Sequence, residues 1–205
     1  TRSAPVIDCQ NKIGINVEKT GAAIIVNSGN ANAFTGRHGE LAVREIIAEL
    51  STRVQIPVER IFSSSTGVIG ELLEYQKIIN VFDYLVDSLH VSKIENAARA
   101  IMTTDTFPKG SSVKVSSSGG KITISGIAKG SGMIAPNMGT MLVYIFTDAL
   151  IDKNDLQSIV SDLNDETFNC ITVDSDTSTS DTLLVSATGK SGIQVNKNDL
   201  DFREE

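Results

Sequence analysis

One stretch near the middle of the sequence constrains the fold most, because two apolar runs meet there across a short loop. Residues 121–128 alternate apolar and polar side chains, which predicts a half-buried β-strand. Residues 141–147 form a second apolar run, which predicts a buried strand. The residues between the runs include three glycines, a proline and an asparagine, which interrupt regular structure. The sequence therefore predicts two strands joined by a glycine-rich loop.

Thr140 ends this loop, directly after Gly139 and ahead of the second apolar run. Two interpretations fit that position. In a self-cleaving precursor, the threonine hydroxyl attacks the preceding carbonyl, the peptide bond breaks, and threonine becomes an N-terminal nucleophile. In the plainer interpretation, the segment is a hairpin loop between two core strands. Spacing alone does not decide between them.

The amino-acid composition argues against two classes of binding partner, nucleic acid and membranes. The 205 residues suit one large domain or two small ones, and 40% hydrophobic with 21% charged residues is typical of a globular chain. The net charge of -7 argues against nucleic acid, whose recognition needs a basic surface. No apolar run approaches the roughly 18 residues of a membrane span. We therefore expect neither nucleic acid nor a membrane as partner.

Cysteine and histidine are sparse, and none of them stands in a recognisable metal or disulfide pattern. The chain has Cys9, Cys170, His38 and His90. We expect buried free thiols and ordinary histidines, with neither a disulfide scaffold nor a zinc site.

Periodicity and turn residues predict alternating strands and helices, which places the chain in the α/β or α+β class. The opening residues resemble a strand, residues 27–32 a turn, and residues 196–205 a solvated end. Strands are predicted at 22–26, 60–63 and 170–173, with a hairpin over 112–127 that turns at Gly119–Gly120. Helices are predicted at 37–50, 71–89, 92–102 and 152–163, the last capped by Asp152.

The small residues 63–70 lie between a predicted strand and a predicted long helix. Such a turn exposes backbone N–H groups, and the N-terminus of a helix that starts there favours the binding of a negatively charged group. Thr66 and Gly67 could in this way form an oxyanion hole. The alternative is a plain helix cap.

The segment 174–178 is rich in aspartate and hydroxyl groups and follows a predicted strand. It resembles the D-x-D-x-T sequence of aspartyl-phosphate phosphatases, although Ser178 is an imperfect match. We favour the alternative that these side chains form hydrogen bonds to turns near the site.

Residues 129–142, Lys-Gly-Ser-Gly-Met-Ile-Ala-Pro-Asn-Met-Gly-Thr-Met-Leu, resemble the processing site of the ornithine acetyltransferases (glutamate N-acetyltransferases) of arginine biosynthesis. Further matches follow in family order and spread over most of the chain: residues 26–32, 65–71, 100–109 and 171–182.

The resemblance implies a fold and an organisation. The fold would be the mixed α+β layered sandwich of the N-terminal-nucleophile-like aminopeptidases and ornithine acetyltransferases. Residues 1–205 would be a single catalytic domain and an interior part of a longer chain. Cleavage would make 1–139 part of an α chain and 140–205 the beginning of a β chain.

The resemblance also implies a reaction. Thr140 would carry an acetyl group from N-acetylornithine to glutamate, with its own α-amino group as base. Thr66 and Gly67 would stabilise the oxyanion, while Thr103, Lys129 and Thr140 would bind substrate. No metal or other cofactor is implied. Acetyl-CoA as a second donor stays open, and a cytoplasmic heterotetramer of two α and two β chains is expected.

One departure and two alternatives accompany this resemblance. Gly139 stands where alanine is common in the family, and glycine permits the strained backbone that self-attack needs. An N-terminal-nucleophile aminopeptidase would use the same threonine with water as acceptor. An uncleaved, non-enzymatic binding domain would keep the bond between Gly139 and Thr140 intact.

Overall fold

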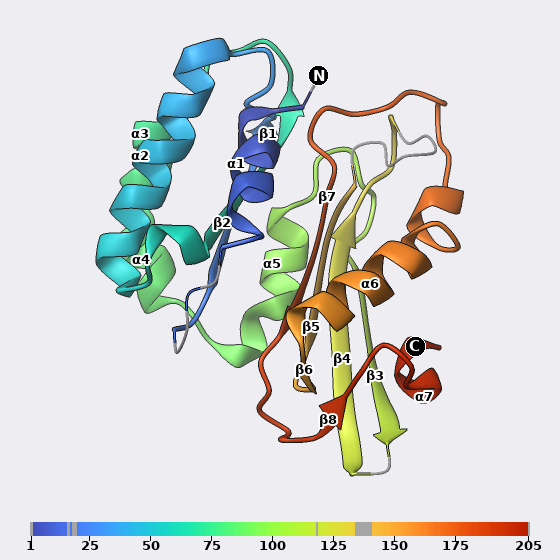
Figure 1. Ribbon diagram of the computed structural model, residues 1–205. Coiled ribbons are helices and arrows are strands. Elements are labelled where there is room, and N and C mark those ends of the chain that lie inside the picture. Colours follow the sequence, from blue (N-terminus) through green and yellow to red (C-terminus); the bar gives the residue numbers. More distant parts are fainter. Residues whose placement is uncertain (1, 16, 18–19, 118, 134–140, 205) are drawn as a thin grey trace. The chain divides into compact units, whose positions relative to one another are not determined.

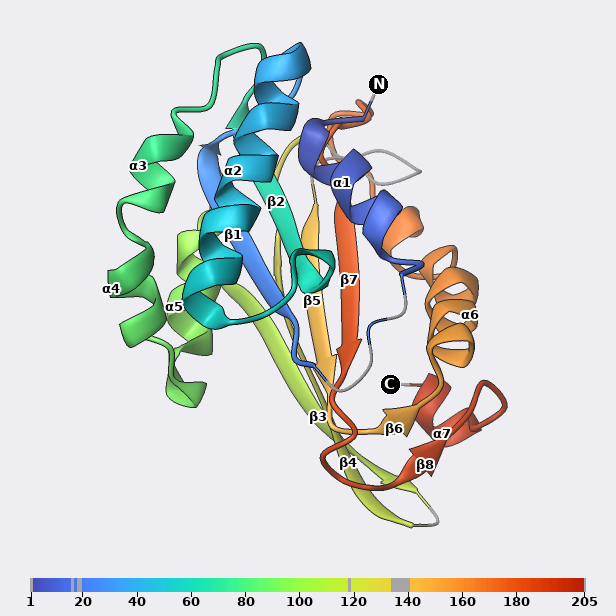
Figure 2. The ribbon, with the colours of Figure 1, turned by 60° about the vertical axis from the view of Figure 1, so that its left-hand side comes forward.

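The computed structural model describes residues 2–15, 17, 20–117, 119–133 and 141–204 (Figures 1 and 2). These residues form two compact units. The first comprises residues 1–103 with 179–181, and the second comprises residues 104–178 with 182–205. Each contains helices and strands, so the mixed α/β class predicted from the sequence is confirmed.

The first unit is built on a parallel pair of strands, β1 (Ala23–Asn30) and β2 (Ile61–Val68). Helix α2 (Gly36–Val54) connects them and covers one face of the pair (Figure 2). The helix buries apolar residues at the spacing of one helical face. With Ile61 of β2 they form the core of this unit: Ala42, Val43, Ile46, Ile47 and Leu50.

Helix α1 (Ala4–Lys12) replaces the strand that the opening residues suggested, so that prediction was wrong. Ser3 occupies the N-cap position and Pro5 lies in the first helical turn, where its missing N–H costs nothing. Strand β1 also continues through residues 27–30, which were expected to turn, because the pairing with β2 extends that far.

The long helix predicted over 71–89 is instead two short ones, α3 (Tyr75–Ile79) and α4 (Phe82–Asp87). Leu73 and Phe82 both pack into the core against α2. Nine residues correspond to two and a half helical turns, so one straight helix would place these two side chains on opposite faces. The bend between α3 and α4 allows both to be buried. The short helices η1 (Val58–Arg60), η2 (Val91–Lys93) and α5 (Ile94–Ala100) complete the unit.

The second unit contains a four-stranded sheet in the order β3-β4-β5-β7. β3 (Lys109–Ser117), β4 (Gly120–Lys129) and β5 (Leu142–Thr147) are antiparallel, whereas β7 (Thr182–Ala187) runs parallel to β5. The hairpin of β3 and β4 was predicted, although both strands are longer than expected. The two strands predicted on either side of the glycine-rich segment are also confirmed, since β4 and β5 are antiparallel neighbours.

Helix α6 (Lys153–Asn164) packs on one face of this sheet (Figure 1). The side chain of Asp152 accepts a hydrogen bond from the Asn154 N–H at 2.7 Å, which confirms the predicted cap. Ile159 of this helix is buried with Ile122 of β4 and with residues from β6 (Leu150–Ile151), β8 (Gln194–Val195) and α7 (Leu200–Arg203).

Near the C-terminus one prediction was wrong, and the prediction of a solvated end holds for most of the described residues 196–204 but not for all of them. Residues 168–170 form the short helix η3 (Phe168–Cys170), and only isolated bridges at Val173 and Asp174 follow it, where a strand was expected. Asp174 and Ser175 have φ angles of 66° and 58°, which no β-strand accommodates. The end that was expected to be solvated contains α7, whose Phe202 is buried.

Within the described part of the chain, no helix is both long and apolar enough to cross a membrane. The same residues contain no group of three or more histidine, cysteine, aspartate or glutamate side chains that could hold a metal ion.

The two cysteines lie in different environments. Cys9 of α1 is buried against β2, where its thiol donates a hydrogen bond to the carbonyl oxygen of Ser63 at 3.2 Å. Burial raises the pKa of the Cys9 thiol to about 11. Cys170 is exposed, so the prediction of a buried thiol holds for Cys9 and was wrong for Cys170.

We expect one thiol per chain to react with iodoacetamide in the folded protein at pH 8. The thiolate is the reactive form, and Cys9 stays protonated until the pH approaches its raised pKa of about 11. Cys170→Ser protein should therefore be unlabelled when folded and labelled once after denaturation, as counted by intact mass. Rapid labelling of Cys9 in folded Cys170→Ser protein would contradict the packing of α1 on β2.

Candidate active site

Thr66 and Gly67 lie near the end of β2, inside the strand. The predicted turn and helix start are absent at this point, since Gly70 and the residues after it bend before α3 begins at Tyr75. The helix-cap alternative for Thr66 is therefore wrong. The N-terminal helix dipole that the sequence suggested for this site is also not available.

Gly67 occupies a position that only glycine can fill. Its φ angle is 131°, and a Cβ atom there would lie 2.3 Å from the carbonyl carbon of Gly29 and 2.6 Å from the nitrogen of Asn30. Gly67 pairs with Gly29 across the two strands, and the register shifts at Asn30. The close approach of two backbones thus explains the glycine. It leaves the backbone of Thr66 and Gly67 in one fixed geometry.

Thr66 has an unusual environment. Its side chain is 0% exposed, and its Oγ1 has no hydrogen-bond partner in the described part of the chain. Ser64 lies two positions earlier on the same face of the strand. Its Oγ is also buried and has no hydrogen-bond partner in the described part of the chain. Because buried hydroxyl groups are normally paired, the Thr66 hydroxyl is a candidate to contact a ligand or a reacting group.

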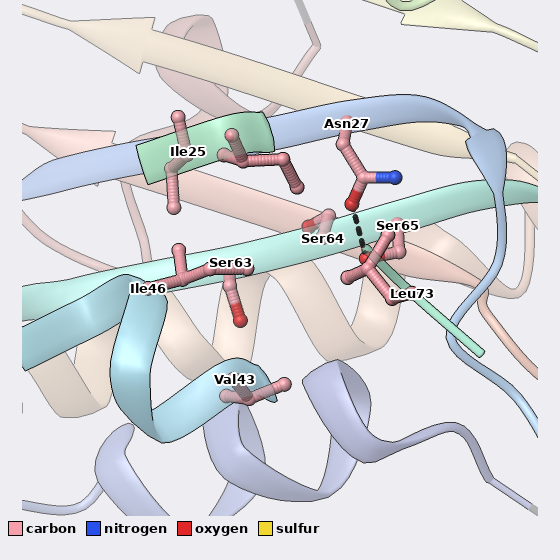
Figure 3. A pocket seen from close by; sticks show the side chains of 9 residues that line it. Ile25, Asn27, Val43, Ile46, Ser63, Ser64, Ser65 and Leu73 are labelled. Carbon is pink, nitrogen blue, oxygen red and sulfur yellow. Dashed lines mark hydrogen bonds between the residues drawn. The ribbon is translucent and has the colours of Figure 1, made fainter. Parts of the chain in front are cut away.

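A small cavity lies beside β2 on the side of α2 (Figure 3). Its volume is about 10 Å³, and its lining includes Asn27 and Ser65, whose side chains are joined by a hydrogen bond of 2.6 Å. A space of this size matches a single water molecule and is far below the roughly 300 Å³ of a ligand pocket. It is therefore not a substrate pocket.

Lys129 is the last residue of β4 and is 3% exposed. It pairs with Leu142 of β5, two residues after Thr140 in the sequence. The alternative that Lys129 is a solvated charge at a strand end is therefore wrong. A lysine ammonium can bind a carboxylate, so Lys129 stays a candidate for substrate binding.

The other residues expected at the site divide into two groups. Thr103 lies exposed in a bend after α5. Gly139 and Thr140, the predicted cleavage site and nucleophile, lie outside the described residues.

Three of the four residues after Lys129 form hydrogen bonds with side chains from elsewhere in the sequence. Asp105 accepts one from the Gly130 N–H at 2.9 Å, and Asp174 accepts one from the Met133 N–H at 3.3 Å. The hydroxyls of Thr104 and Ser131 are 2.7 Å apart. The interpretation that the carboxylates of 174–178 bond to turns is confirmed for Asp174. Asp105 lies within the matched residues 100–109, where no role of its own was predicted for it.

The two histidines have structural contacts. His38 Nε2 lies 3.2 Å from the carbonyl oxygen of Leu73, and His90 Nδ1 accepts from the Ser92 N–H at the start of η2. These contacts agree with the ordinary role that the sequence predicted for them.

Comparison with curated proteins finds relatives that share one name. An arginine biosynthesis bifunctional protein ArgJ of Ruegeria pomeroyi is 56% identical over 198 residues, covering 97% of this chain and 48% of the relative. The protein of the same name from Bartonella henselae is 48% identical and covers 92% of this chain and 45% of its own. The chain thus spans about half the length of the curated relatives it matches.

Two solved structures share the fold. The crystal structure of ArgJ from Bacillus halodurans has a TM-score of 0.58 and 37% identity, covering 67% of this chain and 71% of its own. Ornithine acetyltransferase from Mycobacterium tuberculosis, solved in complex with ornithine, has a TM-score of 0.56 and 27% identity, covering 69% and 72%. The sequence model of the ArgJ family matches residues 1–205. On these findings together, the chain belongs to the ArgJ family.

Proposed function

We propose that this chain takes part in the transfer of an acetyl group from N-acetylornithine to glutamate, with Thr140 as the nucleophile. The observation that carries the proposal is the family match over residues 1–205. The relative from Mycobacterium tuberculosis was solved in complex with ornithine, which supports ornithine derivatives as the class of substrate. The strand register places Lys129 opposite Leu142, two residues after Thr140 in the sequence, which supports a role for Lys129 near that part of the chain.

The nucleophile would be made by self-cleavage. The Thr140 hydroxyl attacks the carbonyl carbon of Gly139, and the amide nitrogen leaves with a proton, which gives an ester. Water then hydrolyses the ester to a carboxylate on Gly139 and a free amino group on Thr140. An α-amino group has an ordinary pKa of about 7.7–8.0, so a large part of it is neutral and can serve as base near neutral pH.

Acetyl transfer then follows in two steps. The Thr140 hydroxyl attacks the acetyl carbonyl of N-acetylornithine, and ornithine leaves with the proton taken up by the α-amino group. The amine of glutamate attacks the resulting acetyl ester and releases N-acetylglutamate. Thr66 and Gly67 would stabilise the oxyanion that forms in each of the two steps. Lys129 and Thr103 would bind the substrate, and Lys129 would contact the carboxylate of the substrate.

The remaining expectations stay predictions. They are the use of acetyl-CoA as a second donor, the heterotetramer of two α and two β chains, the cytoplasmic location, and the origin of residues 1–205 as part of a longer, cleaved chain. No observation favours the aminopeptidase or the uncleaved binding domain over acetyl transfer.

The first test is the cleavage itself. Purified complete protein should run as two chains, and N-terminal sequencing should find that the second begins at Thr140. Thr140→Ala should stay one chain, whereas Thr140→Ser should still cleave because serine keeps the hydroxyl. A second chain with another N-terminus, or a single chain after long incubation of folded protein, would overturn self-processing.

The second test concerns Lys129. Lys129→Met keeps the volume and the apolar stem but removes the charge, so the Michaelis constant for N-acetylornithine should rise about tenfold to a hundredfold, as expected for a lost charge-assisted hydrogen bond. The matched control is Lys121→Met at the exposed start of the same strand, which should leave the constant unchanged. If stably folded Lys129→Met protein has the same Michaelis constant for N-acetylornithine as the unaltered protein, Lys129 does not bind the substrate.

The third test separates the chemistry of Thr66 from its packing. Thr66→Val replaces a buried, unpaired hydroxyl by a methyl group of the same shape, so the melting temperature should hold or rise slightly. If the hydroxyl donates to the oxyanion, kcat for acetyl transfer should fall about 100-fold. Ser64→Ala removes an equivalent unpaired hydroxyl on the same face and should keep kcat. Near-normal kcat in both variants would exclude the Thr66 hydroxyl from the reaction.

A further inference from the structure

Side chains from two distant parts of the sequence form hydrogen bonds with three of the four residues 130–133. These residues follow β4 directly and precede the segment that contains Gly139 and Thr140. One set of contacts comes from residues 104–105, ahead of β3, and the other from Asp174. All of them lie within the second unit.

Asp105 is the strongest of these contacts. Its side chain is 1% exposed, and the same oxygen, Oδ1, accepts from the Gly130 N–H at 2.9 Å and from Lys109 Nζ at 2.5 Å. Burial of a carboxylate is costly unless it is paired, and a bond to a charged acceptor is about twice as strong as a neutral one. The ion pair with Lys109 therefore keeps the carboxylate in place, and the carboxylate in turn fixes the first residue of the loop.

The other two contacts fix the following residues. The Thr104 and Ser131 hydroxyls share a hydrogen bond, and Asp174 Oδ2 accepts from the Met133 N–H. Met133 and Asp174 have φ angles of 56° and 66°, which are uncommon for residues other than glycine and persist where surrounding contacts hold them. A Cβ at Gly132 would lie 3.2 Å from Asp174 Oδ2, so the carboxylate also lies close to the backbone between these residues.

We propose that Asp105, Thr104 and Asp174 act as a clamp on residues 130–133 that positions the loop for cleavage between Gly139 and Thr140. This inference rests on the proposed self-cleavage. The other end of the loop is fixed independently, because Leu142 is fully buried and paired with Lys129. Attack of a hydroxyl on its own peptide requires near-contact geometry, and a misplacement of about 1 Å can slow such a step roughly a hundredfold. The three side chains would act as positioning residues, through the backbone of residues 130–133.

The test follows the cleavage of freshly synthesised complete precursor, made by cell-free translation and sampled over time on a denaturing gel. Asp105→Ala and Asp174→Ala should each slow the appearance of the two fragments by roughly tenfold to a hundredfold. Asp174→Asn should restore most of the rate, because its amide oxygen can still accept from the Met133 N–H.

The matched control is Asp148→Ala. Asp148 Oδ1 accepts from the Thr123 N–H at 2.8 Å, which is the same kind of bond toward the other end of β4. This variant should lower the melting temperature by a similar amount and cleave at the ordinary rate.

The outcomes separate the two proposals. If the unaltered precursor cleaves and Asp105→Ala and Asp174→Ala cleave as fast, the clamp is overturned while self-cleavage stands. The clamp is equally overturned if Asp148→Ala slows cleavage as much as they do. If the unaltered precursor never cleaves, self-processing is wrong, and the positioning role is wrong with it. Slow clamp variants beside a normal control and a rescued Asp174→Asn support the clamp.

Discussion

The antiparallel pairing of β4 with β5 is the constraint on which the candidate site depends. It places Lys129 opposite Leu142, so the loop that contains Gly139 and Thr140 leaves and re-enters the sheet at neighbouring positions. Leu142 is fully buried and Lys129 nearly so. A lysine is seldom buried without a polar or anionic partner. The packing of the sheet thus fixes both a charge and the ends of the loop, and the chemistry proposed for Thr140 depends on both.

The first unit adds a different constraint, a close approach of two backbones. Gly67 fits against Gly29 and Asn30 only because it has no Cβ atom. The neighbouring Thr66 hydroxyl is buried without a hydrogen-bond partner within the described residues. An unpaired buried hydroxyl weakens a fold, and such groups are often retained at functional sites. This observation makes Thr66 a candidate, and the comparison of Thr66→Val with Ser64→Ala tests whether its hydroxyl takes part in the reaction.

Much of the fold could be predicted from local patterns, and the errors have specific causes. The hairpin of β3 and β4, helix α2 and the Asp152 cap follow from short-range periodicity and turn chemistry. The helix predicted over 71–89 failed because tertiary packing requires Leu73 and Phe82 to be buried on the same side. The role predicted for Thr66 is untested, and the local structure predicted for it was wrong, because Thr66 lies inside β2. Asp105 lies within the family match at 100–109, but no role could be predicted for it, because its bond to Gly130 joins residues 25 positions apart.

The central claim, that Thr140 carries the acetyl group, can be tested on the intact protein by one measurement. Complete protein is mixed with N-acetylornithine in the absence of glutamate, quenched in acid within seconds, and its chains are weighed by mass spectrometry. The account predicts one added acetyl group on the chain that begins at Thr140, and its loss when glutamate is supplied before the quench. Production of N-acetylglutamate with no acetyl group on that chain at any time point would contradict it.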